Sequence, residues 1–145
     1  MDFTIEQKIA LLSPYCICRF KDTTHDKSAH PHYYVYVPCS IKDKFILCIF
    51  TSRIIEKNKY YSKTNEKALQ SLIYIDNTDI DFLDRKTIIE CNQAEIFTQK
   101  SLLYRIEKAQ GFEILSRTIT DELKDKIIDG IKNSPMVKGY IKKSV

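Results

Sequence analysis

Two stretches decide the fold: "HPHYYVYV" (His30–Val37) and "KDKFILCIFTSR" (Lys42–Arg53). Aromatic and β-branched side chains occupy both parities of His32–Val37, and apolar side chains occupy both parities of Phe45–Phe50. Each run therefore predicts a strand that is buried on both faces or wrapped in a barrel. The polar segment "SIKDK" between them predicts a hairpin loop. An antiparallel hairpin places the histidines at the start of the first strand beside Thr51–Arg53 at the end of the second.

Helices are predicted near both ends of the chain. Thr4 and Gln7 have the spacing of a capping box, ahead of apolar positions that share one face. Thr120 precedes an acidic pair and an apolar stripe, which is the pattern of an amphipathic helix; the stripe is Leu123, Ile127, Ile128 and Ile131. Between these helices the pattern predicts further short strands at 15–20, 72–75, 86–90, 95–98 and 112–115, a short helix at 101–108, and polar loops at 21–31, 54–67 and 76–85.

This order of elements predicts a mainly β protein of the α+β class, because strands and helices do not alternate. Short strands with unequal loops favour a small curled antiparallel sheet or barrel, flanked by an N-terminal and a C-terminal helix. The chain of 145 residues fits a single domain. Its predicted parts are an N-terminal helix (1–14), barrel strands and loops (15–115), a C-terminal helix (118–134) and a basic tail (135–145).

Several classes of protein are excluded or disfavoured by the sequence. No apolar run approaches the roughly 20 residues of a membrane span, and the N-terminus lacks the pattern of a secretory signal, so we expect a cytoplasmic protein without membrane contact. The five cysteines are interpreted as reduced thiols. Cys16-x-Cys18 has no second close pair of ligands, and no phosphate-binding, HExxH, GxSxG or CxxC motif occurs, so no metal or cofactor is expected. A nucleophilic cysteine assembled in space stays open, although nothing singles out one thiol.

The strand ends carry the best candidates for chemistry. His30 and His32 are candidate acid/base groups, because imidazole titrates near neutral pH. Thr51 and Ser52 are candidate ligands of phosphate or hydroxyl groups, and Arg53 is the candidate charge stabiliser. Together these groups suit cleavage of RNA through its own 2′-hydroxyl, which needs no metal. The alternative is that the same side chains only cap strands by bonding to the backbone.

The segment that follows the second strand predicts nucleic-acid binding. Residues 41–67 are rich in lysine, whereas residues 76–95 are acidic, a charge distribution that fits either a nucleic-acid binder or an ordinary solvated surface. A tyrosine pair lies among the lysines, and aromatic rings beside cations stack on unpaired bases. The alternative is that one ring packs on the core and the lysines are only solvated. The candidate RNA-binding residues are Lys57, Lys59, Tyr60, Tyr61, Lys63 and Arg85.

These features together resemble the MazF/PemK-like ribonuclease toxins of bacterial toxin–antitoxin systems. "HPHYYVYV" is similar to the family's Arg-Pro followed by an apolar strand, and "FILCIFTSR" is similar to its second strand ending in Thr-Ser or Thr-Thr. "TIIECNQAEIF" and "ITDELKDKIIDGI" are similar to its later strand pair and C-terminal helix. The resemblance spans roughly residues 15–133.

The resemblance implies an SH3-like barrel and metal-independent cleavage of single-stranded RNA, with an antitoxin protein or RNA as a partner and a homodimer as a possible assembly. The family's catalytic threonine carries over to Thr51. Its catalytic arginine does not, because His30 precedes Pro31 here; Arg53 or Arg85 then has to supply the cation. The alternative function is a non-catalytic module on the same barrel that binds nucleic acid or protein through Tyr60, Tyr61 and the neighbouring lysines.

Overall fold

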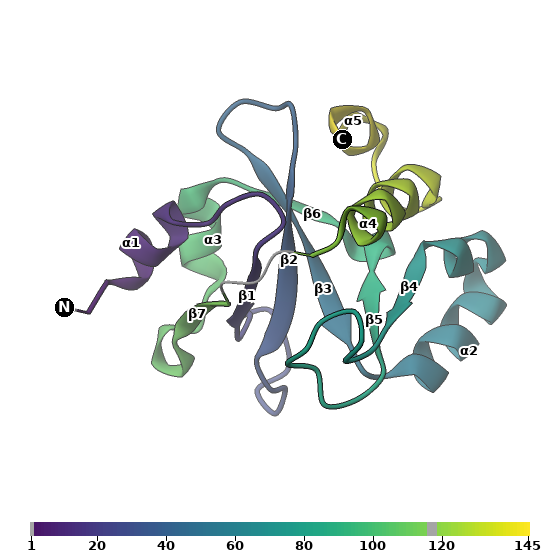
Figure 1. Ribbon diagram of the computed structural model, residues 1–145, viewed down its shortest axis with the longest axis horizontal. Coiled ribbons are helices and arrows are strands. Elements are labelled where there is room, and N and C mark those ends of the chain that lie inside the picture. Colours follow the sequence, from purple (N-terminus) through teal and green to yellow (C-terminus); the bar gives the residue numbers. More distant parts are fainter. Residues whose placement is uncertain (1, 116–118) are drawn as a thin grey trace.

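The computed structural model describes residues 2–115 and 119–145 and contains one curled antiparallel sheet with helices around it (Figure 1). The strands are β1 (Ile17–Phe20), β2 (His32–Pro38), β3 (Phe45–Thr51), β4 (Leu72–Ile75), β5 (Thr87–Glu90), β6 (Glu95–Phe97) and β7 (Phe112–Leu115). The helices are α1 (Ile5–Ala10), α2 (Ile54–Thr64), α3 (Gln99–Arg105), α4 (Asp121–Asn133) and α5 (Gly139–Ser144), with 3₁₀ turns η1 (Glu66–Ser71), η2 (Cys91–Gln93) and η3 (Lys108–Gln110). Residue 1 of the predicted N-terminal segment and residue 118 of the predicted C-terminal segment lie outside the described residues.

The predicted β2–β3 hairpin is confirmed and forms the centre of the sheet. Its register runs from Tyr34 opposite Ile49 to Pro38 opposite Phe45. The full strand order is β4-β5-β3-β2-β1-β7, and β6 also pairs with β3. The first half of β3 pairs with β6, and its last residues pair with β5. The turn η2 connects β5 to β6, so two consecutive strands pair with different parts of β3.

The predicted α+β class, with a helix at each end of an antiparallel sheet, is confirmed. The sheet is nevertheless open, because the pairings among the described residues leave β4 and β7 as its two ends. The C-terminal basic segment 135–145 contains α5, whose Ile141 is buried. Among the described residues, no helix is long and apolar enough to cross a membrane.

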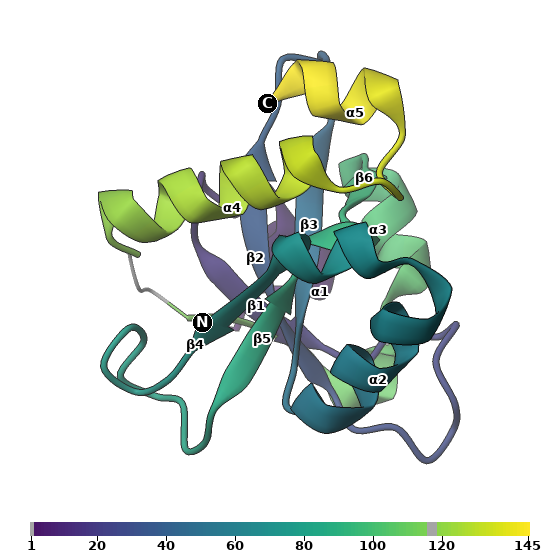
Figure 2. The same cartoon turned by 90° about the vertical axis from the view of Figure 1, so that its right-hand side faces the viewer.

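Both faces of the central hairpin are buried, as predicted. Because side chains alternate along a strand, one set packs beneath α4 and α5, and the other packs against α1 and α3. Figure 2 shows α4 lying across the sheet with α5 beside it. The first core is centred on Val35, Cys48 and Ile127, and the second on Phe20, Leu47 and Leu102.

The helix-start signals at the two ends of the chain are confirmed. The Thr4 hydroxyl accepts the backbone N–H of Gln7, and the Gln7 side chain in turn accepts the N–H of Thr4. Thr120 likewise caps α4 by accepting the N–H of Leu123. In the apolar stripe, Leu123, Ile127 and Ile131 are buried and Ile128 is half-buried.

The predicted loop at 54–67 is wrong, because this segment forms α2 and the start of η1. The segment contains neither glycine nor proline, and its lysines and glutamates are good helix formers. Tyr61 is the buried residue of α2, and it packs with Ala68, Leu72 and Ile88. Ile54 also packs against this cluster, but two anchoring side chains on a mainly polar helix give too little apolar periodicity for the pattern to stand out.

Candidate functional site

The end of the sheet where β2 begins and β3 ends carries two of the predicted catalytic residues on one face. His32 shares a face with Tyr34, and Thr51 shares a face with Ile49, because alternate residues of a strand point the same way. Tyr34 and Ile49 are directly opposite each other and border the same core. His32 and Thr51 therefore lie at the same end of one face, as the hairpin argument predicted.

The residues beside this pair are more exposed. His30, Ser52 and Arg53 are all exposed. The backbone N–H of Arg53 donates to Oγ1 of Thr51 at 3.2 Å, and this bond leaves the threonine hydroxyl proton free to donate elsewhere. Arg53 also occupies the N-cap position of α2, so the candidate site leads directly into that helix.

The fold changes the acid–base chemistry of His32. Burial lowers its pKa, and the positive charges of His25, Lys21, Arg53 and His30 lower it further. The ring is therefore neutral at pH 7 and has a nitrogen lone pair that can accept a proton. Its Nδ1 atom is buried and has no hydrogen-bond partner among the described residues. A neutral imidazole surrounded by cationic groups suits a base that acts beside an anion.

His25 is a member of the site that the sequence did not single out. Its ring lies edge-on to that of His32, with the centroids 5.4 Å apart. Its Nε2 atom is 4.0 Å from Oδ2 of Asp22. His25 belongs to the polar segment 21–31, which has no periodicity, and the only available signal was its closeness in sequence to the other two histidines.

A buried lysine holds this segment in place. The Nζ of Lys21 donates to the backbone carbonyls of Asp22, His25 and Asp26 at 3.1, 3.4 and 2.8 Å. Three carbonyl acceptors compensate for the burial of its charge. The segment is therefore wrapped around one ammonium group, and this fixes the backbone that carries His25.

A second anchor joins this segment to α3 and β6. Arg105 donates to both oxygens of Asp22 at 3.1 and 2.6 Å, and to both oxygens of Glu95. Asp22 is buried and also accepts the backbone N–H and the hydroxyl of Thr24. Burial by itself raises the pKa of Asp22, but the bonds from Arg105 and Thr24 outweigh it and leave the pKa below its ordinary value. Asp22 and Arg105 are 83 positions apart, so no local pattern could reveal this pair.

The predicted RNA-binding residues divide into exposed and buried groups. Lys59, Tyr60 and Lys63 are exposed on α2. Tyr61 is 1% exposed, so its ring cannot stack on a base in this conformation; the alternative, that one tyrosine packs on the core, describes it correctly. Arg85 is exposed in the β4–β5 loop, where its Nε donates to Asp84.

Tyr61 and Lys57 instead meet a buried carboxylate. The Tyr61 hydroxyl donates to Glu90 at 2.6 Å, and the Nζ of Lys57 lies 3.6 Å from the same oxygen. The backbone N–H of Asn92 donates to the other oxygen of Glu90. Burial, followed by the hydrogen bond to Glu90, raises the pKa of Tyr61. This network holds α2 against β5.

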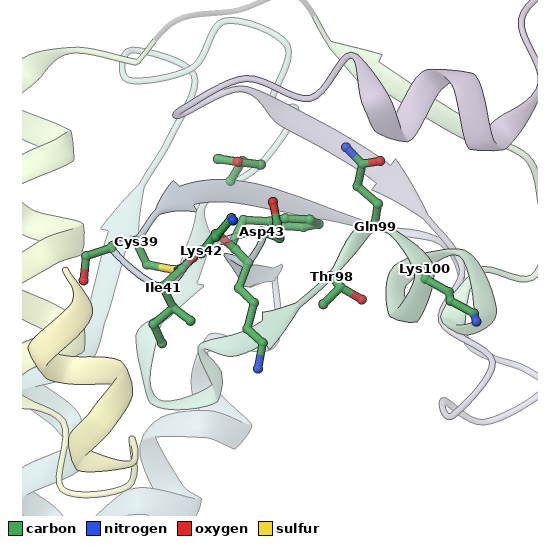
Figure 3. A pocket seen from close by; sticks show the side chains of 11 residues that line it. Cys39, Ile41, Lys42, Asp43, Thr98, Gln99 and Lys100 are labelled. Carbon is green, nitrogen blue, oxygen red and sulfur yellow. Dashed lines mark hydrogen bonds between the residues drawn. The ribbon is translucent and has the colours of Figure 1, made fainter.

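Two cavities lie along the face that carries His32 and Thr51. The smaller, of about 340 Å³, is lined by side chains from β2, β3, β6, η2 and α3 and includes His25 and Arg105. The larger, of about 610 Å³, lies at the β2–β3 turn, at the other end of the hairpin. Figure 3 shows Lys42 and Asp43 of that turn on one side and Gln99 and Lys100, at the start of α3, on the other. None of the predicted catalytic residues lines either cavity.

The described residues contain no group of three or more histidine, cysteine, aspartate or glutamate side chains placed to hold a metal ion. The five cysteines are free, and four of them are buried. Burial raises the pKa of the Cys16 and Cys18 thiols, which makes them poor nucleophiles. Comparison of the chain with protein-family models, curated proteins and solved structures found no match.

Proposed function

We propose that this protein is a metal-independent endoribonuclease of the MazF/PemK-like kind, which cleaves single-stranded RNA through its 2′-hydroxyl. The observation that carries the proposal is the position of His32: a half-buried imidazole with a lowered pKa, beside His25 and at the same sheet end as Thr51. The charges that act on it suit a site for a phosphodiester. The proposal includes the SH3-like character of the curled sheet, the antitoxin partner and the homodimer that the resemblance implies.

The chemistry needs a base, an acid and a stabiliser of phosphoryl charge. His32 takes the proton of the 2′-hydroxyl, whose oxygen then attacks the neighbouring phosphorus atom. His25, beside the Asp22 carboxylate, donates a proton to the departing 5′-oxygen. The products are a 2′,3′-cyclic phosphate and a free 5′-hydroxyl, so no water or metal enters the first step.

Arg53 and Thr51 have the supporting roles. The Arg53 guanidinium balances the negative charge that grows on the phosphoryl oxygens, as the arginine of the family does. The Thr51 hydroxyl, which already accepts the N–H of Arg53, donates its proton to one of those oxygens. His30 stands where the family has arginine and is exposed, so we assign the acid role to His25 in its place.

The test is incubation of the purified protein with an unstructured, end-labelled RNA in EDTA. We expect fragments that end in a cyclic phosphate, and we expect His32→Ala and Thr51→Val each to reduce the cleavage rate by about 10²-fold or more. Thr64→Val, at the far end of α2, is the matched control and retains the wild-type rate. A substrate with 2′-deoxyribose at the cleaved position stays intact if the 2′-hydroxyl is the nucleophile.

A second function is supported by the exposed part of α2. Tyr60 stands between Lys59 and Lys63 and is exposed, an arrangement that suits stacking and phosphate contact without catalysis. Intact RNA with salt-sensitive binding that Tyr60→Ala weakens would favour this non-catalytic module and would contradict the ribonuclease proposal.

A further inference from the structure

The smaller cavity has both apolar and polar walls. Its volume of about 340 Å³ lies within the range of small-ligand pockets. Apolar side chains from β3 and β6, including Leu47, Ile49 and Phe97, form one part of the wall. Polar groups form the rest, including Glu95 and Arg105.

Tyr34 provides an unpaired donor in this wall. Its side chain is 5% exposed, and its hydroxyl oxygen is buried without a hydrogen-bond partner among the described residues. Burial, followed by the charge of Asp22, raises the pKa of Tyr34, so the hydroxyl keeps its proton. A buried hydroxyl without a partner costs free energy, and an acceptor atom on a ligand in the cavity would remove that cost.

Glu95 provides the acceptors. Its side chain is 48% exposed, and each carboxylate oxygen has a lone pair beyond the one that Arg105 uses. Asp22 is different, because Arg105 and Thr24 already donate to it and its side chain is only 4% exposed. Arg105 makes four of the five donor contacts that a guanidinium offers, so one N–H of its Nη1 remains.

We propose that this cavity binds a guanine base, with Glu95 accepting its N1–H and N2–H and the Tyr34 hydroxyl donating to O6. Guanine is the base whose Watson–Crick edge carries two adjacent N–H donors. Adenine and cytosine each place a ring-nitrogen acceptor next to their amino group, which an ionised carboxylate repels. Uracil has a single N–H between two carbonyls. A carboxylate that must find two donors therefore discriminates against all three.

The inference rests on the proposed function where it concerns RNA, because His25 belongs both to this cavity and to the candidate catalytic site. His25 lines the cavity, and its ring is 5.4 Å from that of His32. A guanine in the cavity would thus have its own ribose and phosphate near the two histidines. The cavity would then select the guanosine next to which the chain is cut.

The first test measures binding without cleavage, on the full-length protein. Calorimetric titration with guanosine 3′-monophosphate is compared with the adenosine, cytidine and uridine analogues and with inosine 3′-monophosphate, which lacks the 2-amino group. We expect the guanosine nucleotide to bind at least about tenfold more tightly than the first three, and several-fold more tightly than the inosine nucleotide.

Two variants and one control connect this selectivity to the cavity. Tyr34→Phe keeps the ring that stacks on Phe20 and every ion pair of Arg105, and Glu95→Gln removes the ionised acceptor. Each is expected to weaken guanosine nucleotide binding about tenfold, whereas Glu113→Gln, exposed on β7, leaves it unchanged. If Glu95→Gln lowers the folded fraction in circular dichroism, Tyr34→Phe decides the question alone.

The second test uses RNA pentamers that contain one guanosine or one inosine among adenosines, so that a base within RNA is distinguished from a free nucleotide. Equal binding of the guanosine, adenosine, cytidine and uridine nucleotides, no binding, or unchanged binding in both variants would overturn the inference. Guanosine-selective binding without RNA cleavage would support the cavity while the proposed function fails. Cleavage with no preference for guanosine would support the function and overturn the cavity.

Discussion

The ion-pair anchor around Arg105 predicts a large loss of stability when the arginine is removed. Arg105→Ala leaves Asp22 buried, with 4% of its side chain exposed, and with Thr24 as its remaining donor. Breaking a buried pair by removing one partner costs about 3–5 kcal/mol. The two Thr24 bonds lower this cost, and the half-exposed pair with Glu95 adds at most about 1 kcal/mol. We expect a loss of about 3 kcal/mol.

The assay is urea unfolding followed by circular dichroism. With a slope of about 2 kcal/mol per molar, the midpoint should fall by about 1.5 M urea. The control is Arg85→Ala, which removes an exposed arginine that pairs with its exposed neighbour Asp84 and should change stability by less than about 0.5 kcal/mol.

The pH dependence has a defined sign. The pKa of Asp22 is lower in the folded protein than its unfolded value of about 3.9, so its contribution is complete above that pH and is lost as the pH falls below it. As the pH falls from about 4 to the lowered pKa of Asp22, the free energy of unfolding of Arg105→Ala should therefore decrease less than that of the wild type. If Arg105→Ala costs no more than Arg85→Ala, Asp22 is hydrated without its partner, and Arg105 does not anchor the segment that carries His25.

Three further predictions follow from other contacts. Tyr61→Phe removes the donor to buried Glu90 and should destabilise the protein by about 1.5–3 kcal/mol in the same urea assay, without changing RNA affinity. Weaker RNA binding at unchanged stability would contradict the buried position of Tyr61. Gly130→Ala would place a Cβ 2.9 Å from Sγ of Cys91 and should lower the free energy of unfolding by about 1–3 kcal/mol. Cys91→Ala in the same chain should largely restore this stability. Equal losses with and without Cys91→Ala would refute the clash. Because burial and neighbouring cations lower the pKa of His32, the acid limb of the cleavage rate should have its midpoint below about pH 6.5, and a midpoint above that value in a pH–rate profile would argue against His32 as the base.

Local patterns predicted the elements whose stability is local or whose burial is uniform. The capping box of Thr4 and Gln7 satisfies its own backbone groups, so it works in any tertiary context. The strands of the β2–β3 hairpin are apolar on both parities, and packing a layer on each face of the sheet buries both sets of side chains. For the same reason the placement of His32 opposite the end of β3 followed from the hairpin alone.

The sequence of α2 contains only a weak helical signal. Ile54, Asn58 and Tyr61 have helical spacing, and no residue of the segment breaks a helix. The many polar residues instead favoured a loop, and the single ring that anchors the helix appeared as a candidate for RNA stacking. Whether a tyrosine faces solvent or a buried glutamate depends on the position of β5, about 30 residues later in the chain.

The sequence by itself determined the α+β class, the central hairpin, the terminal helices and the polar end where His32 and Thr51 meet, because these follow from periodicity, capping and antiparallel pairing. Only the tertiary structure decided the open order of the sheet, the place of His25 beside His32, the Asp22–Arg105–Glu95 anchor and the cavity next to it. The sheet order and the cavity depend on contacts between segments that are distant in the sequence, and Asp22 and Arg105 are 83 positions apart. The anchor depends on the desolvation of charged groups, which takes effect only when the fold has removed water from around them.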